Sequence, residues 1–134
     1  MIKPLDDRTF VSGQIRPADI PSIKSSGVTL IVCNRPDGEE PGQPTAAEVE
    51  EAASALGIDF RHVPIIRGIG PSDAEEMQEA LEAASGKMLA YCRTGNRSTL
   101  VWAVARRGQG ASVEELQRAA TGAGYDLSPI EHLL

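Results

Sequence analysis

A cysteine and an arginine separated by four residues mark the segment of this sequence best suited to chemistry. The segment reads Cys92-Arg93-Thr94-Gly95-Asn96-Arg97 and is followed by Ser98. It lies where a short apolar run ends and a helical pattern begins, so backbone N–H groups after Cys92 are expected to converge on its sulfur. Unpaired amides and the positive end of a helix dipole stabilise a thiolate over a thiol. The pattern therefore predicts a cysteine nucleophile in an anion-binding loop.

The other residues of this loop suit the same role. Gly95 permits a tight turn, and Arg97 offers a fixed fork of donors to an oxyanion. Ser98 is expected to cap the following helix, and its hydroxyl is also placed to hydrogen-bond the Cys92 thiolate. Cys92 and Arg97 are the predicted catalytic residues. The residues predicted to line the anion-binding loop are Arg93, Thr94, Gly95, Asn96 and Ser98.

A second segment, residues 34–43, follows another apolar run and is expected to border the same site. Asp37 in this segment is a candidate general acid, although Pro36-Asp37-Gly38 is also a common turn sequence. Cys33, at the end of the apolar run, is either a relay thiol that reaches Cys92 or a core residue beside Ile31 and Val32. The sequence leaves both alternatives open, with the turn and the core favoured.

Composition narrows the classes of partner and cofactor. The net charge of -6 argues against binding to nucleic acid or to an anionic membrane surface. His62 and His132 are the two histidines and no cysteine pair has ligand spacing, so neither a metal site nor a cofactor is predicted. The N-terminus has charges where a signal peptide would be apolar, and no run approaches the ~20 apolar residues of a membrane span. We therefore expect a cytoplasmic protein with reduced thiols.

Strand and helix patterns alternate along the chain. Short apolar runs predict strands over residues 28–33, 59–65 and 87–91. Capping residues and helical spacing predict helices over residues 45–57, 71–85 and 98–107, another from Ser112, and a last short one after Ser128-Pro129. This alternation predicts a single α/β domain over residues 1–134, a parallel-sheet sandwich with helices on both faces. Ligands of such sheets bind beyond the carboxyl ends of the strands.

The loop around Cys92 resembles the active loops of two enzyme classes. Tyr91-Cys92-Arg93-Thr94-Gly95-Asn96-Arg97-Ser98 is similar to the loop of rhodanese-type sulfurtransferases, in which a cysteine takes up sulfane sulfur as a persulfide. It also resembles the loop of cysteine phosphatases. The phosphatase pattern, however, has five residues between cysteine and arginine, and this sequence has four, from Arg93 to Asn96. A shorter loop makes a tighter cradle, which suits a sulfur atom better than a phosphoryl group.

Nearly the whole chain resembles the phosphatase-like domain family of β-lactamase hydrolase-like proteins. The resemblance lies in residues 10–14 (Phe-Val-Ser-Gly-Gln), in residues 34–44 (Asn-Arg-Pro-Asp-Gly-Glu-Glu-Pro-Gly-Gln-Pro) and in the Cys92 loop. It implies a dual-specificity-phosphatase-like fold. Members of this family occur alone or joined to persulfide dioxygenase domains, so the resemblance also implies a persulfide dioxygenase partner and a place in sulfide detoxification.

Two departures weigh against phosphate ester hydrolysis. Phosphatases of this fold supply an acidic residue from a loop about thirty residues before the cysteine, but residues 64–70 (Pro-Ile-Ile-Arg-Gly-Ile-Gly) contain none. Asp73 lies nearby, at a position better suited to capping a helix. Tyr91 also stands where phosphatases have a histidine.

The sequence therefore favours sulfur transfer as the activity. In this scheme Cys92 takes sulfane sulfur from a small anionic donor, thiosulfate or a persulfide, and passes it to a thiol acceptor. Arg97 and the loop amides would bind the donor. Cysteine phosphatase activity through a phosphocysteine is the alternative, and a non-enzymatic sulfur carrier is a third possibility.

Overall fold

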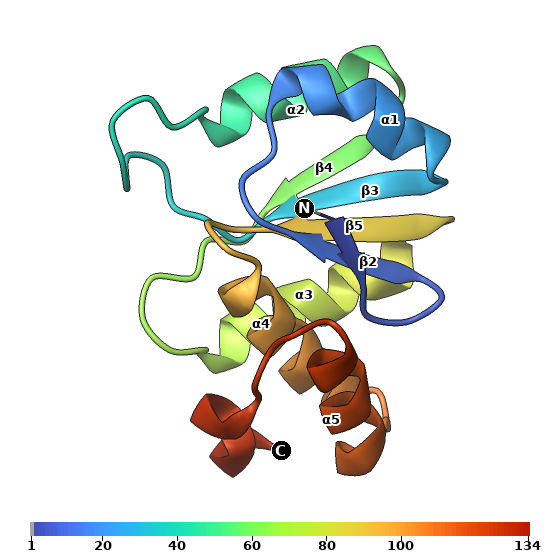
Figure 1. Cartoon of the computed structure of the whole chain (residues 1–134), viewed down its shortest axis with the longest axis vertical. Coiled ribbons are helices and arrows are strands. Elements are labelled where there is room, and N and C mark those ends of the chain that lie inside the picture. The colour runs from blue at the N-terminus through green and yellow to red at the C-terminus, as the bar shows by residue number, and fades with distance from the viewer. Residues whose placement is uncertain (1) are drawn as a thin grey trace.

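One sheet organises the computed structural model, which describes residues 2–134 (Figure 1). Within these residues the sheet has five strands in the order β1-β2-β5-β3-β4. The strands are β1 (Ile2–Pro4), β2 (Thr9–Ser12), β3 (Val28–Cys33), β4 (Asp59–His62) and β5 (Lys87–Tyr91). Strands β2, β5, β3 and β4 are parallel to their neighbours, whereas β1 is antiparallel to β2.

Helices cover both faces of this sheet, as the sequence predicts (Figure 1). On one side lie α1 (Ile20–Ser25) and α2 (Ala46–Ala55), and on the other side lie α3 (Pro71–Ala83), α4 (Asn96–Gly108) and α5 (Val113–Gly122). Two 3-10 segments, Pro17–Asp19 and Ser128–Leu133, complete the chain. Each face has its own buried cluster, so β3 and β5 are enclosed between two apolar layers.

Apolar runs and capping residues mark the central elements in the sequence. Strands β3 and β5 begin and end as predicted. Thr45 accepts a hydrogen bond from the Glu48 amide (3.1 Å) at the start of α2, and Ser112 accepts one from the Glu115 amide (3.1 Å) at the start of α5. These caps satisfy amides that a helix cannot pair internally.

The structure corrects several other expectations. The predicted all-parallel sheet has the antiparallel β1 at its edge, and the elements of the first 25 residues were not anticipated. Strand β4 ends at His62, before the predicted residue 65, although the Val63 and Ile65 amides still donate to the Cys33 and Asn34 carbonyls (both 2.9 Å). Helix α4 begins at Asn96 and not at residue 98, since Gly95 supplies the left-handed turn (φ 92°) that starts it.

Loops that follow the four parallel strands gather at one edge of the sheet (Figure 1). They are residues 13–16 after β2, residues 34–45 after β3, residues 63–70 after β4 and the Cys92 loop after β5. Parallel strands bring their carboxyl ends together, so segments far apart in the sequence meet here. No helix of the described residues is long and apolar enough to cross a bilayer.

Candidate active site

Cys92 is the first residue after β5, and its side chain is at the base of the loop. The residue is 1% exposed. Its backbone N–H donates to the Ser12 carbonyl (3.3 Å), which ties the loop to the end of β2. Its Sγ accepts a hydrogen bond from the Gly95 amide (3.1 Å). This amide is one of the backbone donors that the sequence predicts around the sulfur.

Both the backbone conformation of Gly95 and its close neighbours exclude a larger residue at this position. Its φ of 92° lies in the left-handed region, and a side chain here would collide with the Tyr125 hydroxyl. That hydroxyl donates a hydrogen bond to the Thr94 carbonyl (2.9 Å). The loop is thus held in its tight shape by a residue from the C-terminal part of the chain.

Arg97 presents its guanidinium to a carboxylate of the neighbouring loop. Its two terminal nitrogens donate to the two oxygens of Glu39, at 2.7 and 2.8 Å, and one of them also donates to the Ile65 carbonyl (2.9 Å). The hydrogen bond from Arg97 is the main cause that lowers the pKa of Glu39 from 4.5 to about 2. An oxyanion that binds the terminal nitrogens of Arg97 must therefore displace an ionised carboxylate.

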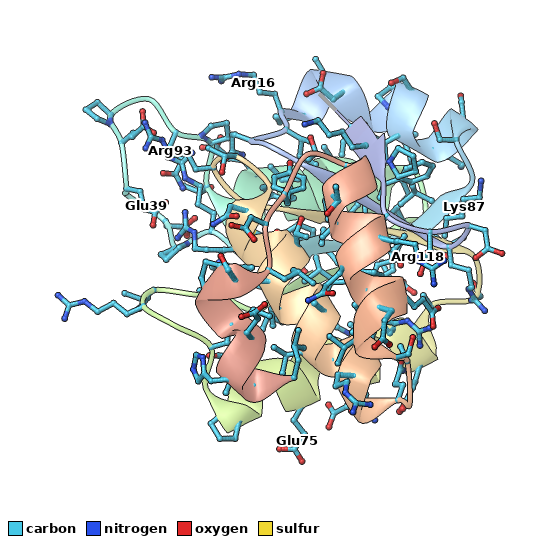
Figure 2. All side chains as sticks on the ribbon, turned by 60° about the horizontal axis from the view of Figure 1, so that its bottom comes forward. Arg16, Glu39, Glu75, Lys87, Arg93 and Arg118 are labelled. Carbon is cyan, nitrogen blue, oxygen red and sulfur yellow. The ribbon has the colours of Figure 1, made fainter. Side chains whose placement is uncertain are left out.

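Arg35 links this pair to the other loops, and its side chain is only 4% exposed. Its guanidinium donates to Glu39 (2.9 Å), to Glu40 (2.9 Å) and to Gln14 (3.0 Å). Arg93 forms an ion pair with the same Glu40 (2.7 Å). Arginines and glutamates from the loop after β3, from the Cys92 loop and from the start of α4 therefore form one network of ion pairs. Figure 2 shows Arg93 and Glu39 on the same side of the molecule.

Sequence patterns do not predict Arg35, Glu39 and Glu40 as site residues, although all three lie in the segment that is expected to border the site. The available signal was their charge in a loop at the carboxyl edge of the sheet. The predicted candidate in this segment is Asp37. In the structure Asp37 accepts a hydrogen bond from the Ala46 amide (2.8 Å), so it holds the turn against the start of α2. This contact supports the turn interpretation over a role as an acid.

Ser98 does not have the predicted contacts. It lies inside α4, where Gly95 occupies the N-cap position, so Ser98 does not cap the helix. Its hydroxyl donates to the side-chain oxygen of Asn34 (2.8 Å), and Asn34 in turn donates to the Val63 carbonyl (2.9 Å). Since a serine hydroxyl has one hydrogen to donate, the predicted bond to the Cys92 thiolate is also wrong. Ser98 instead joins α4 to the first residue after β3, and both side chains are buried.

Two further residues have structural contacts. Asp73 accepts a hydrogen bond from the Gly70 amide (2.9 Å) at the start of α3, as its position in the sequence indicates.

Cys33 is buried, and its thiol donates to the Arg35 carbonyl (3.3 Å). Burial raises the pKa of the Cys33 thiol, which disfavours the thiolate that a relay residue would need. Among residues 2–134 no cluster of three metal-ligating side chains is found.

Similar proteins agree with this architecture. The family model described as "Beta-lactamase hydrolase-like protein, phosphatase-like domain" matches residues 2–111. The β-lactamase hydrolase-like protein of Agrobacterium fabrum is 31% identical over 128 residues, which cover 92% of this chain and 29% of that protein. Its counterpart in Xylella fastidiosa is 29% identical over 125 residues, again 92% of this chain and 29% of the relative. The chain thus spans less than a third of the length of these curated relatives.

Solved structures extend the comparison. A crystal structure from Neisseria meningitidis, described provisionally as a phosphatase, is 37% identical, with a TM-score of 0.84 and coverage of 98% of this chain and 94% of that one. Kinase-associated phosphatase, crystallised with its catalytic cysteine replaced by serine, is 20% identical, with a TM-score of 0.69 and coverage of 87% and 75%. The latter similarity establishes the fold alone, and the predicted resemblance to cysteine phosphatases in fold is confirmed. The chain belongs to the phosphatase-like domain family of β-lactamase hydrolase-like proteins.

Proposed function

We propose that this domain is a cysteine-dependent phosphatase. The observation that carries the proposal is that one short segment holds both a hydrogen-bonded cysteine sulfur and an arginine that binds an anion. The Cys92 sulfur accepts the Gly95 amide hydrogen bond, and Arg97, at the start of α4, already holds a carboxylate through both terminal nitrogens. The carboxylate of Glu39 accepts a hydrogen bond from each terminal nitrogen of Arg97, and this supports a guanidinium geometry suited to two oxygens of a phosphoryl group. The 37% identical relative described as a phosphatase supports the same activity.

The reaction that this arrangement supports has two steps. The Cys92 thiolate attacks phosphorus of a monoester, an S–P bond forms, and the P–O bond to the leaving group breaks, with the electron pair going to the leaving oxygen. Water then attacks the phosphocysteine, which releases inorganic phosphate and restores the thiolate. Arg97 and the loop amides stabilise the negative charge on the phosphoryl oxygens in both steps.

The carboxylates near the site point to a particular substrate preference. Asp37 and Asp73 are engaged with backbone amides, and Arg97 keeps Glu39 ionised. None of the three is placed to protonate a leaving oxygen in this conformation. We therefore expect efficient turnover only for esters whose leaving oxygen is stable as an anion, which are aryl and not alkyl phosphates.

A series of aryl phosphates with leaving groups of increasing basicity tests the proposal. The logarithm of kcat/KM should fall steeply and linearly as leaving-group basicity rises, and Cys92→Ser should abolish turnover throughout the series. If Cys92→Ser retained wild-type turnover, or if no member of the series were hydrolysed, the phosphatase proposal would be wrong.

Sulfur transfer is a second candidate, favoured by the four-residue spacing between Cys92 and Arg97. Here the Cys92 thiolate attacks the outer sulfur of thiosulfate, the S–S bond of the donor breaks, and sulfite leaves. An acceptor thiolate then attacks the outer sulfur of the persulfide and regenerates the Cys92 thiolate. Intact mass after incubation with thiosulfate should show one added sulfur if this candidate holds, and no gain if it does not.

Loop length separates the two candidates in the same protein. We expect that a glycine inserted between Asn96 and Arg97 would raise phosphatase turnover, because the longer loop has the phosphatase spacing. Under the sulfur-transfer candidate the insertion would remove a thiosulfate activity that the wild type has. Circular dichroism and thermal unfolding of the insertion variant would establish that it folds.

A further inference from the structure

A pocket lined with arginines opens beside the Cys92 loop. Its volume is about 300 Å³ and its walls come from three loops at the carboxyl edge of the sheet. The lining consists of Gln14, Arg16, Arg35, Arg93 and residues 40–44. A larger hollow of about 460 Å³ lies beside β4 and the end of α2, but its lining contains neither Cys92 nor any residue of the Cys92 loop. The arginine pocket is therefore the cavity with the chemistry of an anion site.

The wall formed by Arg35 is rigid. Its buried guanidinium is held by Gln14, Glu39 and Glu40, with each of its three nitrogens donating to a different side chain at 2.9 to 3.0 Å. A guanidinium fixed in this way keeps its orientation without a ligand, so little ordering cost remains when an anion enters.

A carboxylate of the protein already occupies part of this pocket. One oxygen of Glu40 accepts from Arg35 (2.9 Å) and from Arg93 (2.7 Å). The Glu40 side chain is 49% exposed and that of Arg93 is 64% exposed, so both can move aside. The lining contains Arg16, Arg35 and Arg93 but only one glutamate, Glu40, and Glu39 pairs with Arg35 from outside the lining. Three arginines minus these two glutamates leave one positive charge in excess. Glu40 therefore shows what kind of group the pocket accepts, and the remaining charge would bind another such group.

Glu39 connects this pocket to the catalytic arginine. A single oxygen of Glu39 accepts from Arg97 (2.8 Å) and from Arg35 (2.9 Å). The two guanidinium groups therefore lie on either side of one carboxylate oxygen. A molecule with one anionic group on Arg97 and another in the pocket needs only a short linker between them.

We propose that the arginine pocket binds a second anionic group of the substrate. The substrate class is then a phosphomonoester that carries a second phosphate or carboxylate on a short, flexible linker. This inference rests on the proposed phosphatase function and states which phosphomonoesters the enzyme would prefer. The second group replaces Glu40 on Arg35 and Arg93, and Arg16 at the rim adds a further positive charge.

Matched pairs of small esters test the pocket. Phenyl phosphates with a phosphonate or a carboxylate at the end of an alkyl tether, two to six carbons long, are compared with esters whose tether ends in a methyl group. Wild-type kcat/KM should be roughly tenfold higher for the charged member at one or two tether lengths, as expected for a charge-assisted contact. The phosphonate and carboxylate series show which second group is preferred.

Two variants with opposite expected effects test whether the arginine pocket causes the preference for the charged ester. Arg16→Ala should lower the preference for the charged ester roughly two- to fivefold, because a rim charge is partly screened by solvent. Glu40→Gln should raise the preference, because the competing carboxylate is gone. Arg118→Ala is the charge-matched control, since Arg118 lies far from Arg16 and Arg93 in Figure 2. It should leave the preference unchanged.

Binding to Cys92→Ser separates failure of the pocket from failure of the phosphatase proposal. Calorimetry should show tighter binding of the charged ester than of its uncharged partner, and Arg16→Ala in this background should reduce the difference. If both esters bound equally at every tether length, the pocket inference would be overturned even if wild-type turnover is normal. If the charged ester bound more tightly but no ester were hydrolysed, the pocket would stand and the phosphatase proposal would fail.

Discussion

Glu39 shows how a single residue can control access to the proposed phosphate site. Its carboxylate occupies the terminal nitrogens of Arg97 and also contacts the buried Arg35. The same contacts that keep Arg97 oriented also compete with any incoming oxyanion. The sequence alone could not predict this contact, because no spacing rule connects Glu39, in the loop after β3, with Arg97, which lies 58 positions later.

Replacement of Glu39 by glutamine should strengthen the binding of inorganic phosphate. A neutral amide competes less well than a carboxylate for the Arg97 guanidinium, so the inhibition constant of phosphate should fall by roughly three- to tenfold. Competition assays with an aryl phosphate would measure this change. Glu48→Gln on the exposed side of α2 is the control and should have no effect. Weaker phosphate binding in Glu39→Gln would mean that Glu39 orients Arg97 more than it blocks it.

The same carboxylate predicts a pH dependence of stability. The pKa of Glu39 is lowered from 4.5 to about 2, chiefly by the hydrogen bond from Arg97. The stabilisation is therefore complete above pH 4.5 and is lost as the pH falls toward 2. Urea unfolding should show wild type more stable than Glu39→Gln at neutral pH, with the difference shrinking through this window. A difference that stayed constant with pH would argue against the ion pair.

At the scale of elements, the site depends on how α4 is attached to β3. Sequence patterns predicted both elements because apolar runs and caps act locally. They did not predict that Ser98, inside α4, donates to Asn34 at the end of β3. Nor did they predict that α4 starts directly after Gly95, whose left-handed turn packs against the Tyr125 hydroxyl. Contacts between distant elements decide these details, and a single sequence contains no local signal for them.

Loss of the Ser98 hydroxyl should be costly. Ser98→Ala leaves the buried side-chain oxygen of Asn34 without this donor, which should lower the free energy of unfolding by about 1–3 kcal/mol. Ser25→Ala removes an exposed helix hydroxyl that donates to the Pro21 carbonyl (3.1 Å) and should change stability by less than about 0.5 kcal/mol. Urea unfolding of both variants would test the contrast. Equal losses would show that the Ser98 contact adds nothing.

At the scale of the whole molecule, the predicted α/β sandwich and the carboxyl-edge site follow from the alternation of strands and helices. The edge pairing of β1 and the role of the C-terminal part do not. Residues 112–134 lie beyond the part matched by the family model, yet α5 packs into the core through Leu116, and Tyr125 holds the Cys92 loop through Thr94. This segment therefore supports both the fold and the site.

Two substitutions separate the contribution of residues 112–134 to stability from their contribution to the Cys92 loop. Leu116→Ala removes a side chain that is 1% exposed and should cost roughly 2–5 kcal/mol of stability, with little effect on kcat below the unfolding transition. Tyr125→Phe removes one hydrogen bond to the loop and should lower kcat by roughly two- to tenfold, with a loss of stability of at most about 1.5 kcal/mol. Aryl phosphate kinetics and thermal unfolding would measure both. Unchanged kcat in Tyr125→Phe would mean that the loop keeps its shape unaided.

The most direct measurement is the identity of the group that Cys92 carries during turnover. Mixing the protein with an aryl phosphate, followed by a rapid denaturing quench and intact and peptide mass analysis, should reveal one phosphoryl group on Cys92 and none in Cys92→Ser. If no phosphoryl group formed, while thiosulfate added one sulfur to the same residue, the phosphatase account would be contradicted and sulfur transfer would take its place.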